Sequence, residues 1–82
     1  MRNYYKYVLY QGNTIVYVGI TNDLDRRTNE HKRDGKRFSD WEKIGNACTK
    51  ESAEYWETER LETYMRNHNG YLPLYNKTAN GK

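Results

Sequence analysis

The sequence has few of the residues that cross-link or interrupt a small protein. Among 82 residues there is one cysteine, Cys48, and one proline, Pro73. A single cysteine excludes an internal disulfide and any metal site built from several thiolates, and it is typical of a reducing compartment. No apolar run approaches the roughly 20 residues that a membrane helix needs. The first ten residues also lack the apolar centre of a signal peptide. We therefore expect one small cytoplasmic domain with no membrane partner.

Tyrosine and basic residues are what the sequence has in quantity. Nine residues are tyrosine while the hydrophobic content is only 35%, so tyrosines have to serve both the core and the surface. The net charge is +3, and residues 1–37 hold eight Lys or Arg against four Asp or Glu. The basic excess is densest in residues 26–37, which favours a phosphate-bearing partner. A charge run by itself is more often a solvated helix face.

The first twenty residues predict a β-hairpin. Residues 4–10 and 14–20 are aromatic and β-branched, as strands prefer, and the loop "QGN" between them contains a glycine. We expect Tyr10 to pair with Thr14 across this loop. Side chains alternate between the two faces of a strand, so this register fixes which residues lie together.

In that register Tyr7 lies opposite Tyr17, and Val8 lies opposite Val16. The two tyrosines then share one face of the hairpin with their hydroxyls free. Val8, Val16 and Val18 lie on the other face, which we expect to be the core.

A helix is predicted next, from a cap at Asn22 or Asp23 to about Asp34, with Gly35 as its stop. The spacing of Leu24, Arg27, Thr28 and His31 places these four side chains on one helix face, while Arg26 points elsewhere.

The rest of the chain predicts a third strand, a long helix and an extended end. The strand covers residues 41–48, and the helix follows a cap at Thr49 or Ser52 and ends at Gly70. The segment "YLPLYNK" closes the domain, and its proline argues against a central strand. The fold class is a small α/β (α+β) domain, with a three-stranded antiparallel sheet packed against helices.

Glu57 is a misfit on the long helix. The apolar side of this helix is defined by Ala53, Leu61, Tyr64 and Met65, and Glu57 projects near the middle of that side. A carboxylate there is costly to bury unless it is paired or holds a cation.

These motifs together resemble the GIY-YIG nuclease family, in particular its small stand-alone branch. The family's first motif is a strand ending in tyrosine, here "YKY" at 5–7, and its second is "YVG" at 17–19. The family helix with an arginine and a histidine is similar to "GITNDLDRRTNEH". The later pattern of alanine, glutamate and apolar residue is matched by Ala53, Glu57 and Leu61, and "PLYN" supplies Asn76. The resemblance covers roughly residues 4–77.

Two features differ from the family pattern. Tyr5 stands where the first motif has a glycine, and the chain between Glu57 and Asn76 is longer than usual. Glu62 lies closer to the usual spacing, but it falls on the helix face opposite Ala53. The metal ligand is therefore Glu57 or Glu62, and we prefer Glu57.

The resemblance implies a metal-dependent DNA endonuclease. Tyr7 would act as general base or orient the attacking water, Tyr17 would hydrogen-bond the phosphate or the water, and Arg27 would grip the phosphate. His31 would orient Tyr7 or carry a proton, and Glu57 would hold one Mg²⁺ or Mn²⁺. The further residues expected at the nucleic acid are Gly19, Lys32, Arg33, Lys36, Arg37 and Asn76, and Asn76 would hold the closing segment against the site by side-chain hydrogen bonds. The expected partner is double-stranded DNA, with a homodimer or a separate specificity protein left open.

Simpler interpretations exist for several of these residues. Tyr7 and Tyr17 could be a packing pair on a sheet, Arg27 could pair with Asp23 or Glu30, and Asn76 could belong to an ordinary turn. For the whole chain, the alternatives are a non-catalytic nucleic-acid-binding module and a viral accessory interaction protein of the same fold. Two further residues are expected to have no role in the site, Cys48 as a small buried residue and His68 as a surface residue.

Overall fold

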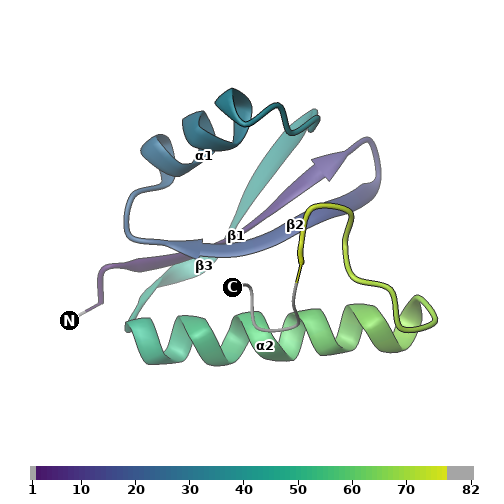
Figure 1. Cartoon of the computed structure of the whole chain (residues 1–82). Helices are drawn as coiled ribbons and strands as arrows, with labels where there is room; N and C mark the ends of the chain where they lie inside the picture. Colours follow the sequence, from purple (N-terminus) through teal and green to yellow (C-terminus); the bar gives the residue numbers. More distant parts are fainter. Residues whose placement is uncertain (1, 78–82) are drawn as a thin grey trace.

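The computed structural model describes residues 2–77 and contains three strands and two helices in the order β1, β2, α1, β3, α2 (Figure 1). Their bounds are Tyr4–Gln11 for β1, Thr14–Thr21 for β2, Leu24–Arg33 for α1, Asp40–Cys48 for β3 and Lys50–Asn67 for α2. Both strand pairs are antiparallel, and the sheet order is β2-β1-β3. The predicted α+β class with a three-stranded antiparallel sheet is confirmed.

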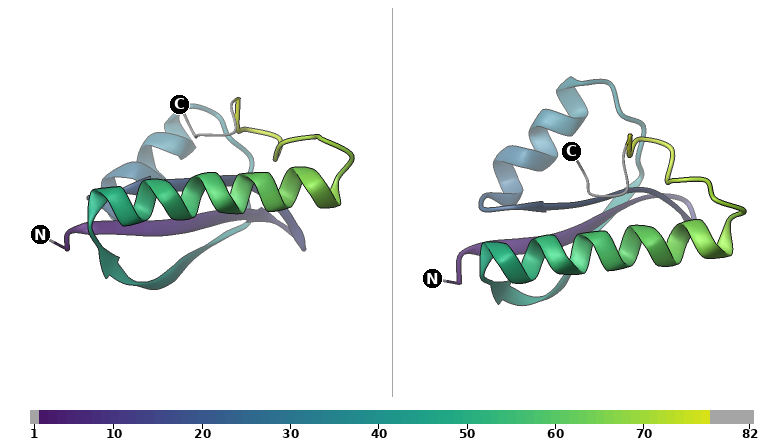
Figure 2. Two further views of the ribbon diagram at one scale, coloured as in Figure 1. Left: turned by 90° about the horizontal axis from the view of Figure 1, so that it is seen from below. Right: turned by 60° about the horizontal axis from the view of Figure 1, so that its bottom comes forward.

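The two helices lie on opposite faces of the sheet (Figures 1 and 2). On the α1 face, Tyr7, Leu9 and Val16 form one buried cluster, and Leu24 of α1 packs against it. On the α2 face, Val8 and Val18 form a second cluster with Leu61 of α2. The core is therefore divided between two faces. The expectation of a single valine-lined core is wrong, because α1 buries the tyrosine face as well.

The hairpin register also differs from the prediction. Tyr7 lies opposite Gly19, and Val8 lies opposite Val18. The pairing shifts between Leu9 and Tyr10, where β2 carries one extra residue. Such a bulge lets an additional side chain turn to the same face as its neighbour. This explains why Val16 and Tyr17 both pack on the α1 face.

The helix boundaries follow capping chemistry. Asp23 caps α1 by accepting from the backbone N–H of Arg26, and Thr49 caps α2 by accepting from that of Ser52. Helix α1 ends before Asp34, as predicted. Helix α2 ends at Asn67, earlier than the predicted stop at Gly70. The helical conformation is already lost at His68, whose φ is −132°, and Asn69 then takes a positive φ of 56° before the glycine is reached.

The C-terminal segment lies along the outer edge of β2. Tyr75 donates its backbone N–H to the carbonyl of Val16, and the side chain of Asn76 bonds to the backbone of Val18. This segment forms no strand, in agreement with the prediction from Pro73. Within residues 2–77, neither helix is long and apolar enough to cross a membrane.

Candidate active site

Four of the predicted site residues come together between the sheet and α1. The ring centroids of Tyr7 and Tyr17 lie 6.0 Å apart, and that of His31 lies 5.8 Å from Tyr7 and 4.7 Å from Tyr17. Arg27, one turn before His31 on α1, interacts electrostatically with both tyrosines. We call these four residues the tyrosine cluster. Strand alternation and helix periodicity bring them together as the sequence predicts.

Tyr7 and His31 form the buried part of the tyrosine cluster. Both side chains are 0% exposed, and the Tyr7 hydroxyl lies 2.7 Å from His31 Nε2. Burial raises the pKa of Tyr7 above its ordinary value, Tyr17 raises it further, and Arg27 opposes the rise only in part. The Tyr7 hydroxyl is therefore protonated at neutral pH, and it is hydrogen-bonded rather than free as expected.

His31 is neutral at pH 7. Burial, together with the positive charges of Arg27 and Lys36, lowers its pKa to about 4. Its Nδ1 is buried and has no hydrogen-bond partner among residues 2–77. A hydrogen on Nδ1 would therefore be a buried donor without an acceptor, so we assign the hydrogen to Nε2. In this tautomer His31 donates to the Tyr7 oxygen, and Tyr7 keeps its own O–H to donate.

Arg27 and Tyr17 are the parts of the tyrosine cluster that reach the surface. The Arg27 side chain is 33% exposed and pairs with Glu30 at 3.1 Å, one of the two simpler partners considered for it. Burial disfavours the charge of Arg27, but Glu30 and the two tyrosines outweigh this effect and raise its pKa. A surface ion pair of this kind is weak, so Glu30 can yield Arg27 to a phosphate.

Gly19 makes the close packing of the two tyrosines possible. It lies opposite Tyr7 on the neighbouring strand. A Cβ atom at this position would lie 2.6 Å from Tyr17 Cε2 and 2.7 Å from the Tyr7 hydroxyl. Every other residue type would therefore push the two rings apart. Close packing thus explains why the motif "YVG" has a glycine at this position.

Lys36 lies beside the tyrosine cluster, in contact range of Tyr17. Its Nζ sits 5.8 Å from the centroid of the Tyr17 ring and 3.6 Å from Asp34. The turn after α1 brings it there, since Gly35 has a φ of +80° and the Lys36 N–H donates to the His31 carbonyl. Sequence reasoning placed Lys36 among the nucleic-acid contacts but missed this position. The glycine directly before it was the available signal.

The other predicted nucleic-acid contacts differ in how exposed they are. Lys32, Arg33 and Arg37 are exposed at the end of α1 and in the turn after it. Asn76 is buried, and both ends of its amide are used by Val18. The amide of Asn76 therefore holds the C-terminal segment against β2 and is not available to a ligand.

Glu57 lies in the other helix layer. It is 5% exposed and shares the buried side of α2 with Ala53 and Leu61, as predicted, whereas Glu62 is exposed. Helix α2 covers the face of the sheet opposite α1 (Figure 1). Among residues 2–77, no three His, Cys, Asp or Glu side chains gather as metal ligands. Glu57 is thus a buried carboxylate on a separate element from Arg27 and His31.

Comparison with known proteins adds no relative: no family model matches the sequence, and no curated protein or solved structure matches the chain.

The two residues set apart from the site are only partly as expected. His68 is exposed at the end of α2, in agreement with the prediction. Cys48 is only partly buried, because it ends β3 at the edge of the sheet, where less of its surface is covered.

Proposed function

We propose that this protein hydrolyses phosphodiester bonds in DNA as a divalent-metal-dependent endonuclease of the GIY-YIG kind. The observation that carries the proposal is the tyrosine cluster, in which a partly exposed arginine stands beside two tyrosines and a neutral buried histidine. Packing of a small core needs none of these polar groups at its centre. The same four positions are those that the family motifs of the sequence select.

Arg27 binds the scissile phosphate in this proposal. A guanidinium matches two phosphate oxygens at once and stabilises the charge that grows on them during hydrolysis. Its partial exposure and its weak pair with Glu30 leave it accessible to the substrate. Lys36 adds a second positive charge, 5.8 Å from the centroid of the Tyr17 ring.

Tyr17 orients the attacking water or the phosphate. Tyr7, buried in the core, positions Tyr17 and Arg27. The burial and raised pKa of Tyr7 favour this positioning role over the general-base role expected from the sequence. His31 fixes the orientation of Tyr7 through the 2.7 Å hydrogen bond.

A metal ion would be held by Glu57. Mg²⁺ binds through one or two carboxylates and keeps several waters, so one carboxylate is a sufficient protein ligand set. When bound, the ion would supply Lewis-acid chemistry on the α2 side of the sheet, and Glu57 does not share the face on which Arg27 would hold the phosphate. The family resemblance supports this assignment, since Glu57 stands at the position of the family's glutamate and lies on the buried side of α2.

The substrate is proposed to be double-stranded DNA. The exposed basic residues Lys32, Arg33 and Arg37 continue from the tyrosine cluster along the end of α1. Such residues contact backbone phosphates without reading sequence. Sequence specificity would then come from a dimer or from a separate specificity protein.

The test is nicking of supercoiled plasmid with Mg²⁺ or Mn²⁺, with EDTA as the metal control. Arg27→Ala is compared with Arg26→Ala, because Arg26 is the exposed neighbour that bonds to Asn22 and faces away from the cluster. We expect Arg27→Ala to lose on the order of 100-fold in rate or more, and Arg26→Ala to stay near wild type.

The other outcomes assign the function differently. Cleavage that survives Glu57→Gln would move the metal ligand to Glu62. Salt-sensitive DNA binding without any cleavage would make the chain a nucleic-acid-binding module. Absence of both binding and cleavage would favour an interaction protein of this fold.

A further inference from the structure

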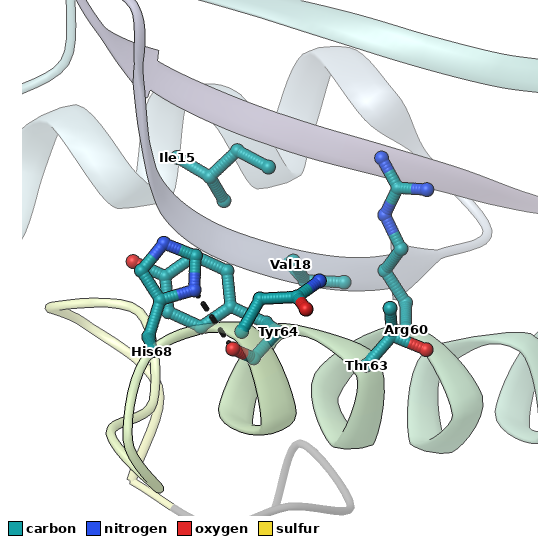
Figure 3. A pocket seen from close by; sticks show the side chains of 7 residues that line it. Ile15, Val18, Arg60, Thr63, Tyr64 and His68 are labelled. Atoms are coloured by element: carbon teal, nitrogen blue, oxygen red, sulfur yellow. Dashed lines mark hydrogen bonds between the residues drawn. The ribbon is translucent and has the colours of Figure 1, made fainter.

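A cavity lies on the face of the sheet that is turned away from the tyrosine cluster. It has a volume of about 270 Å³ and lies between β2 and the C-terminal half of α2 (Figure 3). Ile15 and Val18 form its apolar floor. Both side chains belong to the α2 face of the sheet, whereas Tyr17 belongs to the α1 face. A ligand in this cavity therefore cannot be the group that meets Arg27.

A pair of parallel aromatic rings forms one side of the cavity. The rings of Tyr64 and His68 stack with centroids 3.7 Å apart and planes within 6° of each other. His68 Nδ1 lies 2.8 Å from the Tyr64 carbonyl oxygen, which can only accept, so Nδ1 carries the hydrogen and donates (Figure 3). The ring is held in one orientation, and its Nε2 is left for a ligand.

Polar groups without partners lie elsewhere around the cavity. In Figure 3, Arg60 lies across the cavity from the aromatic pair, with Val18 between them. Within residues 2–77, the Arg60 guanidinium forms no ion pair and no hydrogen bond, and its charge acts on the hydroxyl of Tyr10. The side-chain amide of Asn67, also at the cavity, makes no hydrogen bond in the same part of the chain.

We propose that this cavity binds one nucleoside monophosphate unit. The base would lie against the Tyr64–His68 pair and the apolar floor, since aromatic faces stack on any base. The edge of the base would meet Asn67 and His68 Nε2, which offer donors and an acceptor. The phosphate would pair with the Arg60 guanidinium. The cavity is small for a ligand site, which limits the occupant to about one nucleotide.

This site shares no residue with the proposed nuclease site. The bound unit can be a free nucleotide or the unpaired terminal nucleotide of a strand, because both present the same base and phosphate. In either case the ligand occupies the α2 layer, and none of the groups of the tyrosine cluster takes part.

The test is titration of the ¹⁵N-labelled protein with AMP, followed by amide chemical shifts. We expect saturable shifts at Ile15, Val18 and Tyr64. We also expect Arg60→Gln to weaken binding at least tenfold, while Lys50→Gln, which removes the same charge from the other end of α2, binds as wild type does. Arg27→Ala is expected to bind AMP normally, which separates this site from the nuclease site.

Several results would overturn the proposal. These are an absence of saturable shifts, shifts confined to α1 and Lys36, and shifts at the cavity that Arg60→Gln does not weaken. The source of the ligand follows from a second titration with a DNA duplex carrying a one-nucleotide phosphorylated overhang. If AMP binds more tightly than the duplex, the ligand is a free nucleotide. If the duplex binds more tightly and this binding is lost in Arg60→Gln, the ligand is a strand end.

Discussion

The side-chain amide of Asn76 satisfies both backbone hydrogen-bonding groups of Val18. Its Oδ1 accepts from the Val18 N–H at 2.9 Å, and its Nδ2 donates to the Val18 carbonyl at 2.9 Å. Val18 lies on β2, an edge strand of the sheet, where these groups would otherwise face outward. One asparagine thus takes the place of a fourth strand at this position and closes the edge beside the tyrosine cluster.

Replacing Asn76 is expected to destabilise the fold without changing substrate chemistry directly. Asn76→Ala removes two buried hydrogen bonds and leaves a backbone donor and acceptor unpaired, which costs about 2–4 kcal/mol of unfolding free energy. Urea denaturation measures this loss, and Asn29→Ala on the exposed side of α1 is the control. A loss below 1 kcal/mol, the value of one ordinary hydrogen bond, would show that the edge is satisfied in another way.

Gly19→Ala is expected to damage the tyrosine cluster. The added Cβ would meet Tyr17 and Tyr7 at well under contact distance, so one ring must move, at a cost of about 1–3 kcal/mol. We expect a loss of plasmid nicking together with changed NMR signals of both rings. Gly12→Asn is a suitable control, since a Cβ there meets nothing within 4 Å and asparagine tolerates its φ of +61°. Unchanged ring signals in Gly19→Ala would contradict the packing described above.

The two tyrosines are expected to differ when each loses only its hydroxyl. Tyr7→Phe leaves His31 without its one hydrogen bond in the interior, and should cost about 1–3 kcal/mol of stability. Tyr17→Phe removes a partly exposed hydroxyl and should leave stability within about 0.5 kcal/mol while lowering the nicking rate. Thermal unfolding and nicking rates measure both effects. Equal stability losses in the two variants would place Tyr17 in the interior with Tyr7.

Local patterns in the sequence were sufficient to predict most of the fold. Capping residues such as Asp23 and Thr49 fixed the helix starts, and the helical spacing of Arg27 and His31 placed them on one face. The sequence also showed that Glu57 lies on the inner side of α2. Each of these depends on neighbours within one or two turns of chain.

What the sequence could not provide depended on contacts between distant segments. The bulge that turns Val16 toward Tyr7 results from packing under α1, and no residue in the hairpin signals it. Burial of Tyr7 needs α1 on that face of the sheet, so its altered pKa could not be foreseen. Lys36 reached Tyr17 only because the turn after α1 folds back.

The basic residues after the tyrosine cluster are expected to set the salt dependence of DNA binding. Each phosphate contact contributes about 0.9 to the slope of log affinity against log salt. The double variant Arg33→Gln/Arg37→Gln should therefore reduce this slope by up to about 2. Lys43→Gln/Lys50→Gln removes the same charge from β3 and α2 and should change it little. Fluorescence anisotropy measures both slopes at salt concentrations from about 50 to about 200 mM, the range in which such binding weakens. Equal slopes in the two double variants would remove the basic segment from the DNA interface.

Protonation of His31 is expected to limit stability in mild acid. Its pKa is about 4 in the folded chain against an ordinary value of 6.5, so the unfolded chain binds the proton more readily. The free energy of unfolding should therefore fall as the pH drops from about 6.5 to about 4. Below about pH 4, His31 should cause no further loss. The loss through His31 is at most about 3 kcal/mol. Urea denaturation across this pH range measures it, and His31→Gln should flatten the decline while His68→Gln, at the exposed end of α2, should not. A decline of the same size in His31→Gln would assign the acid sensitivity to other groups.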